Sequence, residues 1–536
     1  MRAVVAWVSG IPGLAPGVSV LALGVGLLIP GLALGVSTAL AAQAVPRSDT
    51  PRRGAARLTA DWRMGLWDHE IRSGQSVALG APLTGDTVGG TSIPLVARLE
   101  QDVRTVGGVP GYVASLGAGR LSVQQDRRTF DFTLDYGFTD RLAVGVTVPM
   151  VRVHTRAQIR MDTTGASLGL NPLLTDPALD SAYIGFFGEF DAALAQLDTS
   201  IAQGTCAPRC PEAQTLSADG HAARDALRRS VYGAGTAGGA PFLPRAGSDG
   251  GRGVDSSIVQ MQQDLGTFGI TSFARAFLLP VDPIDDARFE TALTDRTYGF
   301  GAAPFRNTPR SLRYWLGDIE LQAKYRFAAG PSYAGAAALV LRLPTGRADT
   351  AFDFLDLTAG DDQTDIEAQL VQEITVARRL WLNLSVRAAT QRPGTRERRV
   401  APEAAFLVPL GATATLNWDP GDYLAIDFAP LYRFTREFAA GVTLGYRTRG
   451  RDRYTFAATQ DSTDLAARLG EPTPASLLDD GTAIRGLRLG AAVTYMGPWL
   501  EGDLSIERTI SASGGSGPVP DATVLRVILR ASRKLF

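Results

Sequence analysis

Histidine is scarce in this chain, which limits the chemistry that its side chains can perform. The three histidines are His69, His154 and His221. Nucleophilic hydrolysis needs a base in contact with the nucleophile, and no Gly-x-Ser-x-Gly motif accompanies any of the three. His154 lies near the end of a predicted strand, where a serine of a neighbouring strand could reach it. A barrel hydrolase is therefore only the third interpretation, and we predict that the protein is not an enzyme.

The two cysteines, Cys206 and Cys210, lie close together in the sequence. Two close cysteines in an exported chain favour a disulfide. A zinc site would need four ligands, and no histidine or further cysteine lies nearby. Aspartates clustered between Asp349 and Asp365 could bind calcium, but their spacing does not match a twelve-residue calcium loop. We therefore predict a disulfide, no bound metal and no cofactor.

Strict alternation of apolar and polar residues recurs along much of the chain. The clearest segments run from Thr129 to Phe138 and from Leu316 to Phe327. Successive strand side chains point to opposite faces, so each segment predicts a strand with one apolar and one charged face. A soluble sandwich would bury the apolar face, whereas a transmembrane barrel turns it towards lipid. We predict an all-β fold, an antiparallel transmembrane β-barrel of about 12 to 14 strands.

The charged faces of these strands carry both signs, and in a barrel they line the lumen. The candidate lumen-facing charged residues are Asp131, Asp135, Asp318, Glu320, Lys324, Arg326, Glu367, Glu373, Arg387, Asp427, Glu501, Asp503, Glu507, Arg526 and Arg530. Buried charges need partners. Ion-pair ladders between neighbouring strands in a wet interior would supply them. A ring of charges that selects ions or solutes is the alternative.

Both ends of the chain carry features of export. Residues 1–44 are typical of a secretory signal peptide, because an apolar stretch from Val18 to Leu40 precedes the small residues Ala42 and Ala44. A retained membrane anchor is the alternative. The final residue, Phe536, resembles the terminal aromatic by which bacterial outer-membrane barrels are recognised by the assembly machinery. We expect the protein in the cell outer membrane of a Gram-negative-type bacterium, with outer-membrane lipid and that machinery as partners.

Other segments precede and interrupt the predicted barrel, which spans residues 119–536. Residues 155–313 form an extracellular insertion that caps the lumen or plugs it. Within it, apolar residues recur at helical spacing over 176–203, 218–231 and 256–265. Residues 45–118 could be a lumenal plug, a periplasmic arm or the first strands, and 62–69 and 93–103 could each form a strand.

Three phrases resemble a known family. They run from Asp135 to Leu142, from Leu316 to Phe327 and from Leu343 to Gly346. They resemble the outer-membrane barrel family named for the meta-pathway of phenol degradation and, more distantly, the long-chain fatty-acid and hydrocarbon channels. The resemblance covers 130–535 without the insertion and supplies no catalytic residues.

The resemblance implies passive passage of small, hydrophobic or aromatic molecules as solutes. The second interpretation is a non-transporting surface barrel whose insertion binds a partner or a surface polymer, and a lumen filled with paired side chains would favour it. The net charge of −1 lacks the basic excess of nucleic-acid-binding surfaces, so we expect no nucleic-acid partner.

Overall fold

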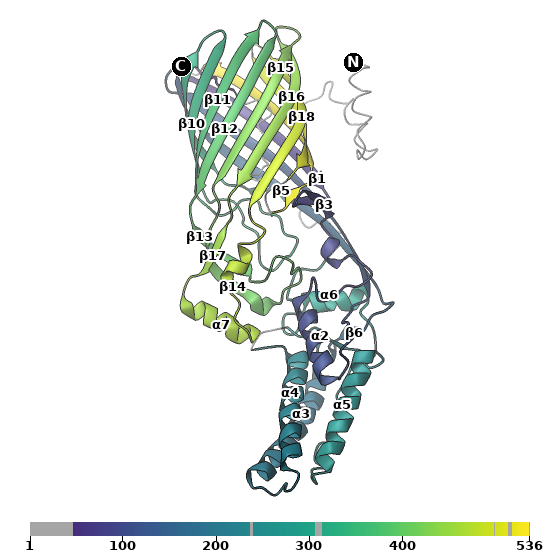
Figure 1. Ribbon diagram of the computed structural model, residues 1–536. Coiled ribbons are helices and arrows are strands. Elements are labelled where there is room, and N and C mark those ends of the chain that lie inside the picture. Colours follow the sequence, from purple (N-terminus) through teal and green to yellow (C-terminus); the bar gives the residue numbers. More distant parts are fainter. Residues whose placement is uncertain (1–46, 236–238, 306–312, 498, 513–516, 535–536) are drawn as a thin grey trace.

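A closed antiparallel β-barrel of twelve strands is the largest element of the protein (Figure 1). The computed structural model describes residues 47–235, 239–305, 313–497, 499–512 and 517–534. The predicted signal peptide (1–44) and Phe536 lie outside the described residues. The barrel strands are β1 (Ala55–Trp67), β4 (Ala118–Gly137), β5 (Leu142–Asp162), β9 (Glu320–Ala329), β10 (Tyr333–Arg342), β11 (Asp365–Ala377), β12 (Leu380–Gln391), β15 (Tyr423–Arg433), β16 (Phe438–Arg449), β18 (Ile484–Met496), β19 (Leu500–Ser511) and β21 (Thr523–Lys534).

The barrel closes where its first and last strands meet. Strand β1 pairs antiparallel with β21, with Ala55 opposite Lys534, and its other edge pairs with β4. The two-residue β8 (Trp315–Leu316) adds to the edge of β5 next to β9. The predicted antiparallel barrel is confirmed, and its strand number lies within the predicted range.

The two ends of the barrel differ in the length of their connections. At one end, which we call the short-turn end, each connection has two to four residues, such as 138–141 between β4 and β5 and 378–379 between β11 and β12. At the other end, the long-loop end, the shortest connection is 512–522 and the longest is 163–314. Both barrel termini lie at the short-turn end, because Ala55 is paired with Lys534.

An apolar belt surrounds the barrel. Leucines of several strands remain exposed on its outer surface, including Leu134 (49%), Leu339 (56%) and Leu504 (50%). A soluble monomer rarely exposes a contiguous apolar surface of this extent. The belt therefore distinguishes a membrane barrel from the soluble sandwich that the same alternation could have formed.

A helical domain extends beyond the long-loop end (Figure 1). It contains α2 (Pro94–Val106), α3 (Asp180–Ala202), α4 (Cys210–Tyr232), α5 (Asp249–Gly266), α6 (Asp286–Thr294), β6 (Leu168–Leu170) and β7 (Phe242–Pro244). Its core includes Phe186, Phe187 and Phe190 of α3, none more than 2% exposed. The domain lies outside the barrel, so it does not plug the lumen. Among the described residues, no helix is long and apolar enough to cross a membrane.

Two smaller units also lie at the long-loop end. One, the loop module, contains β13 (Gly394–Arg399), β14 (Thr413–Asp419), β17 (Arg453–Phe456) and α7 (Thr459–Leu469), with Leu416 and Leu465 fully buried in its own core. The other is a sheet of β2 (His69–Arg72), β3 (Gln75–Ala78) and β20 (Val519–Pro520).

Two sequence-based boundaries and one expected strand differ from the structure. The barrel begins with β1, before residue 119, and the insertion begins after Asp162 rather than at 155, because β5 continues to that residue. The expected strand at 93–103 is wrong, since this segment lies in helix α2. Pro94 starts the helix, and Val96, Leu99 and Val103 form its buried face at helical spacing.

Candidate functional site: the barrel lumen

Strand alternation places the charged side chains on the inner wall of the barrel. In β9, Glu320, Lys324 and Arg326 are half-buried on one face, while Leu321 and Tyr325 are exposed on the other. The same alternation in β21 turns Arg526 inward and Leu525 outward. Successive residues of a strand point to opposite faces, so each apolar residue of the belt is followed by a residue that faces the lumen. The inner wall is polar for this reason.

The first group of charges joins β4, β1 and β21. Arg526 donates from Nε to Asp61 Oδ1 at 2.9 Å, and Arg63 donates to Asp61 Oδ2 at 3.1 Å. Arg63 also forms an ion pair with Asp131. Two arginines and two aspartates thus alternate in sign across three neighbouring strands, as an ion-pair ladder requires.

A second ladder joins β9, β10 and β11. Arg342 binds Glu320 at 2.9 Å and Asp365 at 2.6 Å, so one guanidinium connects both neighbouring strands. Gln391 of β12 donates to the same Asp365 at 3.2 Å. The fork of donors on arginine suits this bridging role better than a lysine ammonium.

A third ladder continues around the wall from β12 to β19. Asp427 accepts from Arg387 at 3.1 Å and from Arg488 at 2.9 Å, and Arg488 reaches Glu507 at 3.8 Å. The Arg488–Asp427 contact spans β16, where Gly445 leaves room for the guanidinium beside the backbone. Glu367 accepts from the hydroxyl of Tyr423 in the same region. In these three ladders, each cation thus lies beside an anion.

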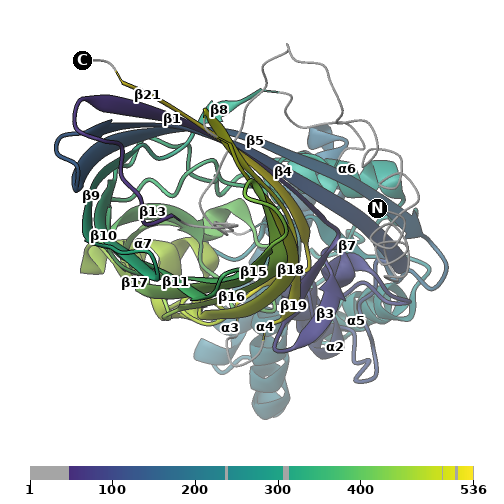
Figure 2. The same ribbon diagram turned by 90° about the horizontal axis from the view of Figure 1, so that it is seen from above.

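The start of the described chain enters the lumen at the short-turn end. We call Arg47–Thr50 the N-terminal segment; Figure 2 shows this purple part of the chain inside the ring of strands. Ser48 is fully buried, and its backbone N–H donates to Glu373 at 2.8 Å. Lys324 donates to the carbonyl of Arg47 at 2.6 Å.

Further contacts hold the same segment from other sides of the wall. Arg47 lies 3.6 Å from Glu501 and stacks over Trp381, while Asp49 pairs with Arg57 at 2.7 Å. Strands β1, β9, β11, β12 and β19 thus all contact a four-residue segment. Through these contacts the N-terminal segment connects strands on different sides of the wall. The ladders, in contrast, connect strands that lie beside one another.

The acidic loop, residues 343–364, covers the long-loop end. Asp318 accepts backbone hydrogen bonds from Gly346 at 2.8 Å and Asp361 at 3.1 Å. Asp356 pairs with Arg347 at 2.7 Å. Asp318, which precedes β9, thus holds the backbone of the loop, and Asp356 forms a pair within it. Among the described residues, no group of three or more potential ligands could hold a metal.

Arg399 joins the acidic loop to the loop module and the helical domain. Its guanidinium donates to the carbonyls of Ala351 at 2.7 Å, Val408 at 2.6 Å and Gly301 at 3.0 Å. It also lies 4.7 Å from the ring of Phe354. Burial lowers the pKa of Arg399 to about 10, which leaves it charged at neutral pH.

A cavity of about 320 Å³ opens beside this attachment. Its lining combines aromatic and aliphatic side chains with charged groups, including Phe354, Phe406, Leu477, Leu478, Asp353 and Arg398. Asp349, also in the lining, pairs with Arg396 at 3.0 Å and with Arg398. Burial would raise the pKa of Asp349, but the attraction of Arg398 and Arg396 outweighs it and lowers that pKa.

The remaining sequence-predicted charges also have defined surroundings. Asp135 contacts Arg57 at 3.4 Å and Gln322 at 2.6 Å. Asp503 accepts from Arg530 at 2.6 Å and from Thr494 at 2.7 Å. Arg326 shares the inner face of Lys324. The structure thus places most of the predicted residues in three ladders, the contacts of the N-terminal segment and the attachment of the acidic loop, and Asp503–Arg530 forms a further pair between β19 and β21.

The sequence analysis missed several members of these networks. Arg57 and Asp61 precede the possible strand at 62–69 and Arg63 lies in it, but none of the three was predicted to face the lumen. Their signal was present, since they alternate with Leu58 and Trp62 as the charged face of a strand should. Arg342 and Arg488 were missed as well, although each follows a leucine within a strand.

Histidine chemistry receives no support from the neighbours of His154. Its Nδ1 lies 2.7 Å from Asp126 Oδ2, as in a Ser-His-Asp triad, but the structure gives no hydrogen-bond partner among the described residues to its buried Nε2, the atom that would contact the serine. In the helical domain, Ser217 and His221 both bind Asp198. A carboxylate between the two groups does not form a nucleophile–base–acid chain.

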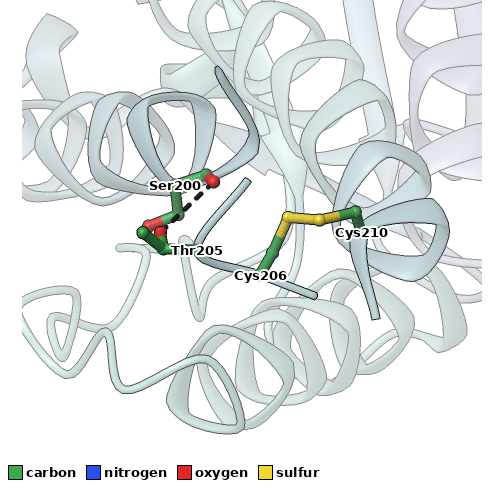
Figure 3. The surroundings of a disulfide bond; sticks show 4 residues. All are labelled: Ser200, Thr205, Cys206 and Cys210. Atoms are coloured by element: carbon green, nitrogen blue, oxygen red, sulfur yellow. Dashed lines mark hydrogen bonds between the residues drawn. A yellow bond between two sulfur atoms is a disulfide. The ribbon is translucent and has the colours of Figure 1, made fainter. Parts of the chain in front are cut away.

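The predicted disulfide between Cys206 and Cys210 is present (Figure 3). It lies where α3 and α4 connect, with Cα atoms 4.9 Å apart. Thr205 donates from its backbone to the carbonyl of Ser200, which closes the end of α3 beside the bond. The disulfide therefore belongs to the tip of the helical domain and not to the lumen.

No protein-family model and no curated protein matches this chain. Among solved structures, the COG4313 outer membrane channel from Pseudomonas putida F1 aligns over 91% of this chain and 98% of its own, with 8% identity and a TM-score of 0.40. The Ralstonia pickettii toluene transporter TbuX aligns over 89% of each chain, with 7% identity and a TM-score of 0.28. The Pseudomonas putida toluene transporter TodX aligns over 90% of each, with 10% identity and a TM-score of 0.25. Similarities this low carry no argument about function.

Proposed function

We propose that the protein is an outer-membrane channel through which small, hydrophobic or aromatic molecules diffuse passively. The observation that carries the proposal is the combination of an apolar outer belt and a charged inner wall in one closed barrel. An apolar belt is stable in lipid, and a charged wall is stable only where water or paired charges surround it. Passive diffusion requires no cofactor and no covalent chemistry.

The proposed orientation places the long-loop end outside the cell. Outer-membrane barrels have short periplasmic turns and longer extracellular loops. The connections of two to four residues at the short-turn end match the periplasmic side. In this orientation the helical domain, the acidic loop and the cavity of about 320 Å³ face the medium.

The proposed route begins at this cavity and ends beside the N-terminal segment. The cavity lies among loops at the long-loop end, and Phe354 and Phe406 supply contacts for an aromatic body. At the short-turn end, a solute would meet Arg47–Thr50, anchored to Lys324 and Glu373. Release of the segment from these anchors would widen the exit, so it acts as a gate in this proposal.

Single-channel current through purified protein in a planar bilayer tests the channel and the gate together. Folding is verified beforehand by heat-shifted gel mobility. We expect discrete steps in simple salt, larger steps when a Gly-Ser sequence of equal length replaces residues 45–50, and reduced current when toluene is added. Arg53→Gln is the matched control, because this exposed side chain follows the segment. No current from folded wild-type protein and from the replacement variant would overturn the proposal.

A second candidate function is a non-transporting surface barrel. Two observations favour it: the charges of the lumen are paired, and the α3–α4 hairpin extends far from the barrel (Figure 1). This candidate requires that neither the wild-type protein nor the replacement variant conducts current. It also requires that a surface polymer binds intact protein and protects α3 to α5 from protease, whereas a channel needs neither result.

A further inference from the structure

The hairpin of β4 and β5 changes the character of its outer face at one level. Phe130 is opposite Met150, and the next outward pair towards the long-loop end is Arg128 opposite Arg152. Nearer the short-turn end, the outward residues are apolar, among them Leu134 and Val146. Beyond the change, the outward residues are polar or charged. The apolar belt therefore ends between these two neighbouring pairs.

The inner face of the same hairpin changes in the opposite sense. Within the barrel it carries charges such as Asp131, whereas beyond the barrel it carries Leu121, Val123, Ala157 and Ile159. These four side chains are buried in the core of the helical domain. Beyond the barrel, the inner side of the hairpin thus packs against the helical domain. Figure 1 shows the strands extending from the barrel towards that domain. On the outer side of the hairpin, Asp126 and His154 are buried (7% and 5% exposed), whereas Arg120, Arg156 and Arg160 are exposed.

Positive charge dominates this outer side. Its charged residues are Arg120, Asp126, Arg128, Arg152, Arg156, Arg160 and Asp162, five cations and two anions. We call the five arginines the arginine stripe. Asp126 is already bound to His154 at 2.7 Å and lies 3.3 Å from Arg128. Arg160 has a partner in Asp286 at 3.1 Å.

Two direct cross-strand pairs within the stripe have like charges. Arg128 is opposite Arg152, and Arg120 is opposite Arg160. Like charges in such positions destabilise a sheet unless an anion lies between them. Arg120, Arg156 and Arg160 are exposed, and Arg128 keeps 33% of its side chain exposed. The stripe is therefore both accessible to an external anion and stabilised by one.

We propose that the arginine stripe binds the phosphates of a multiply phosphorylated lipid in the outer leaflet. Guanidinium groups bind phosphate through two parallel hydrogen bonds. The Arg128–Arg152 pair lies directly above Phe130 and Met150, so a lipid whose phosphate meets the arginines has its acyl chains against the apolar belt. A soluble phosphate would gain only the first of these contacts. The inference rests on the orientation in the proposed function, because it places the stripe at the outer surface.

The test uses variants of the whole protein that differ only in where charge is removed. Arg128→Gln, Arg152→Gln and Arg156→Gln together remove the part of the stripe nearest the belt. Arg141→Gln, Arg378→Gln and Arg436→Gln together form the matched control, since all three side chains are exposed in turns at the short-turn end. Heat-shifted gel mobility verifies that each protein is folded. Native mass spectrometry from detergent micelles then measures bound diphosphoryl lipid A, monophosphoryl lipid A and phosphatidylglycerol.

Wild-type and control proteins should retain diphosphoryl lipid A, and the stripe variant should retain about tenfold less. Monophosphoryl lipid A should bind more weakly than the diphosphoryl form. Equal retention by the stripe variant would overturn the inference, as would an equal loss in the control or retention of phosphatidylglycerol as strong as that of diphosphoryl lipid A. The readout contains no current, so a silent channel that binds the lipid would contradict only the proposed function.

Discussion

The barrel lumen and the core of the helical domain are both interiors, yet their side chains are of opposite kinds. The lumen is lined by ion pairs such as Asp61–Arg526 and Asp427–Arg488. The helical core is made of aromatic and aliphatic groups, with Phe190 stacked on Phe273 at 4.4 Å. A closed barrel satisfies its backbone between strands and buries its apolar belt in lipid, so its interior can carry charge. Helices in water depend on an apolar face packed against a neighbour.

The largest expected effect is in the helical core. Phe190→Ala removes a ring that is 1% exposed, and we expect the helical domain to lose roughly 3–5 kcal/mol of stability. Limited proteolysis in urea reports on the domain, and heat-shifted gel mobility reports on the barrel. Ile184→Ala, on the exposed side of the same helix (61%), is the control and should change stability by less than about 0.5 kcal/mol. Loss of barrel folding in Phe190→Ala would show that the two interiors are not independent.

A smaller effect is expected in the lumen. Asp427→Asn leaves Arg387 and Arg488 without their shared carboxylate, and we expect a loss of about 2–3 kcal/mol, typical of charge-assisted hydrogen bonds. Urea titration of the heat-shifted gel band measures it. A loss above about 3 kcal/mol would indicate a dry lumen, in which an unpaired charge costs far more.

The disulfide should stabilise only the tip of the helical domain. Replacing Cys206 and Cys210 with serine releases a loop of about five residues, for which the chain-entropy relation gives roughly 2 kcal/mol. Hydrogen exchange should rise at the adjoining ends of α3 and α4 and remain unchanged in the barrel. Reduction of wild-type protein should reproduce the effect. Faster exchange throughout the helical core after reduction would contradict this local role.

Acid should weaken the attachment of the acidic loop by about 1 kcal/mol, the scale of a partly buried ion pair. The pKa of Asp349 is lowered in the folded protein, because Arg398 and Arg396 outweigh the effect of burial. The stability it contributes is therefore complete above the ordinary aspartate pKa of about 3.9 and is lost as the pH falls through the lower folded value.

Tryptophan fluorescence measures this acid effect, because Arg396 stacks over Trp418 at 4.0 Å. The signal of wild-type protein should change as the pH falls below about 4, whereas that of Asp349→Asn should not. An identical acid transition in the variant would assign it to other carboxylates.

Local pattern was sufficient for some elements and insufficient for others. The alternation over 129–138 and 316–327 predicted strands that the structure contains in β4 and β9. The segment 93–103 was read as a strand because a short apolar segment fits either period. Its helix is decided by packing, since Val96, Leu99 and Val103 are buried against the rest of the helical domain. Only the end of β1, within 62–69, was considered as a strand, although Arg57, Asp61 and Arg63 alternate with apolar residues.

The amino-acid sequence by itself determined the amphipathic strands, the mixed signs of their polar faces and the disulfide, because these depend on neighbours a few residues apart. Tertiary structure alone decided which charges pair. Asp61 and Arg526 are separated by 465 positions and meet only because β1 closes on β21. Barrel closure likewise places five strands in contact with Arg47–Thr50. In the β4–β5 hairpin, packing against the helical domain makes the inner face apolar beyond the barrel, where the outer face becomes polar. Strand register and barrel closure set these contacts, and neither is encoded in any single segment.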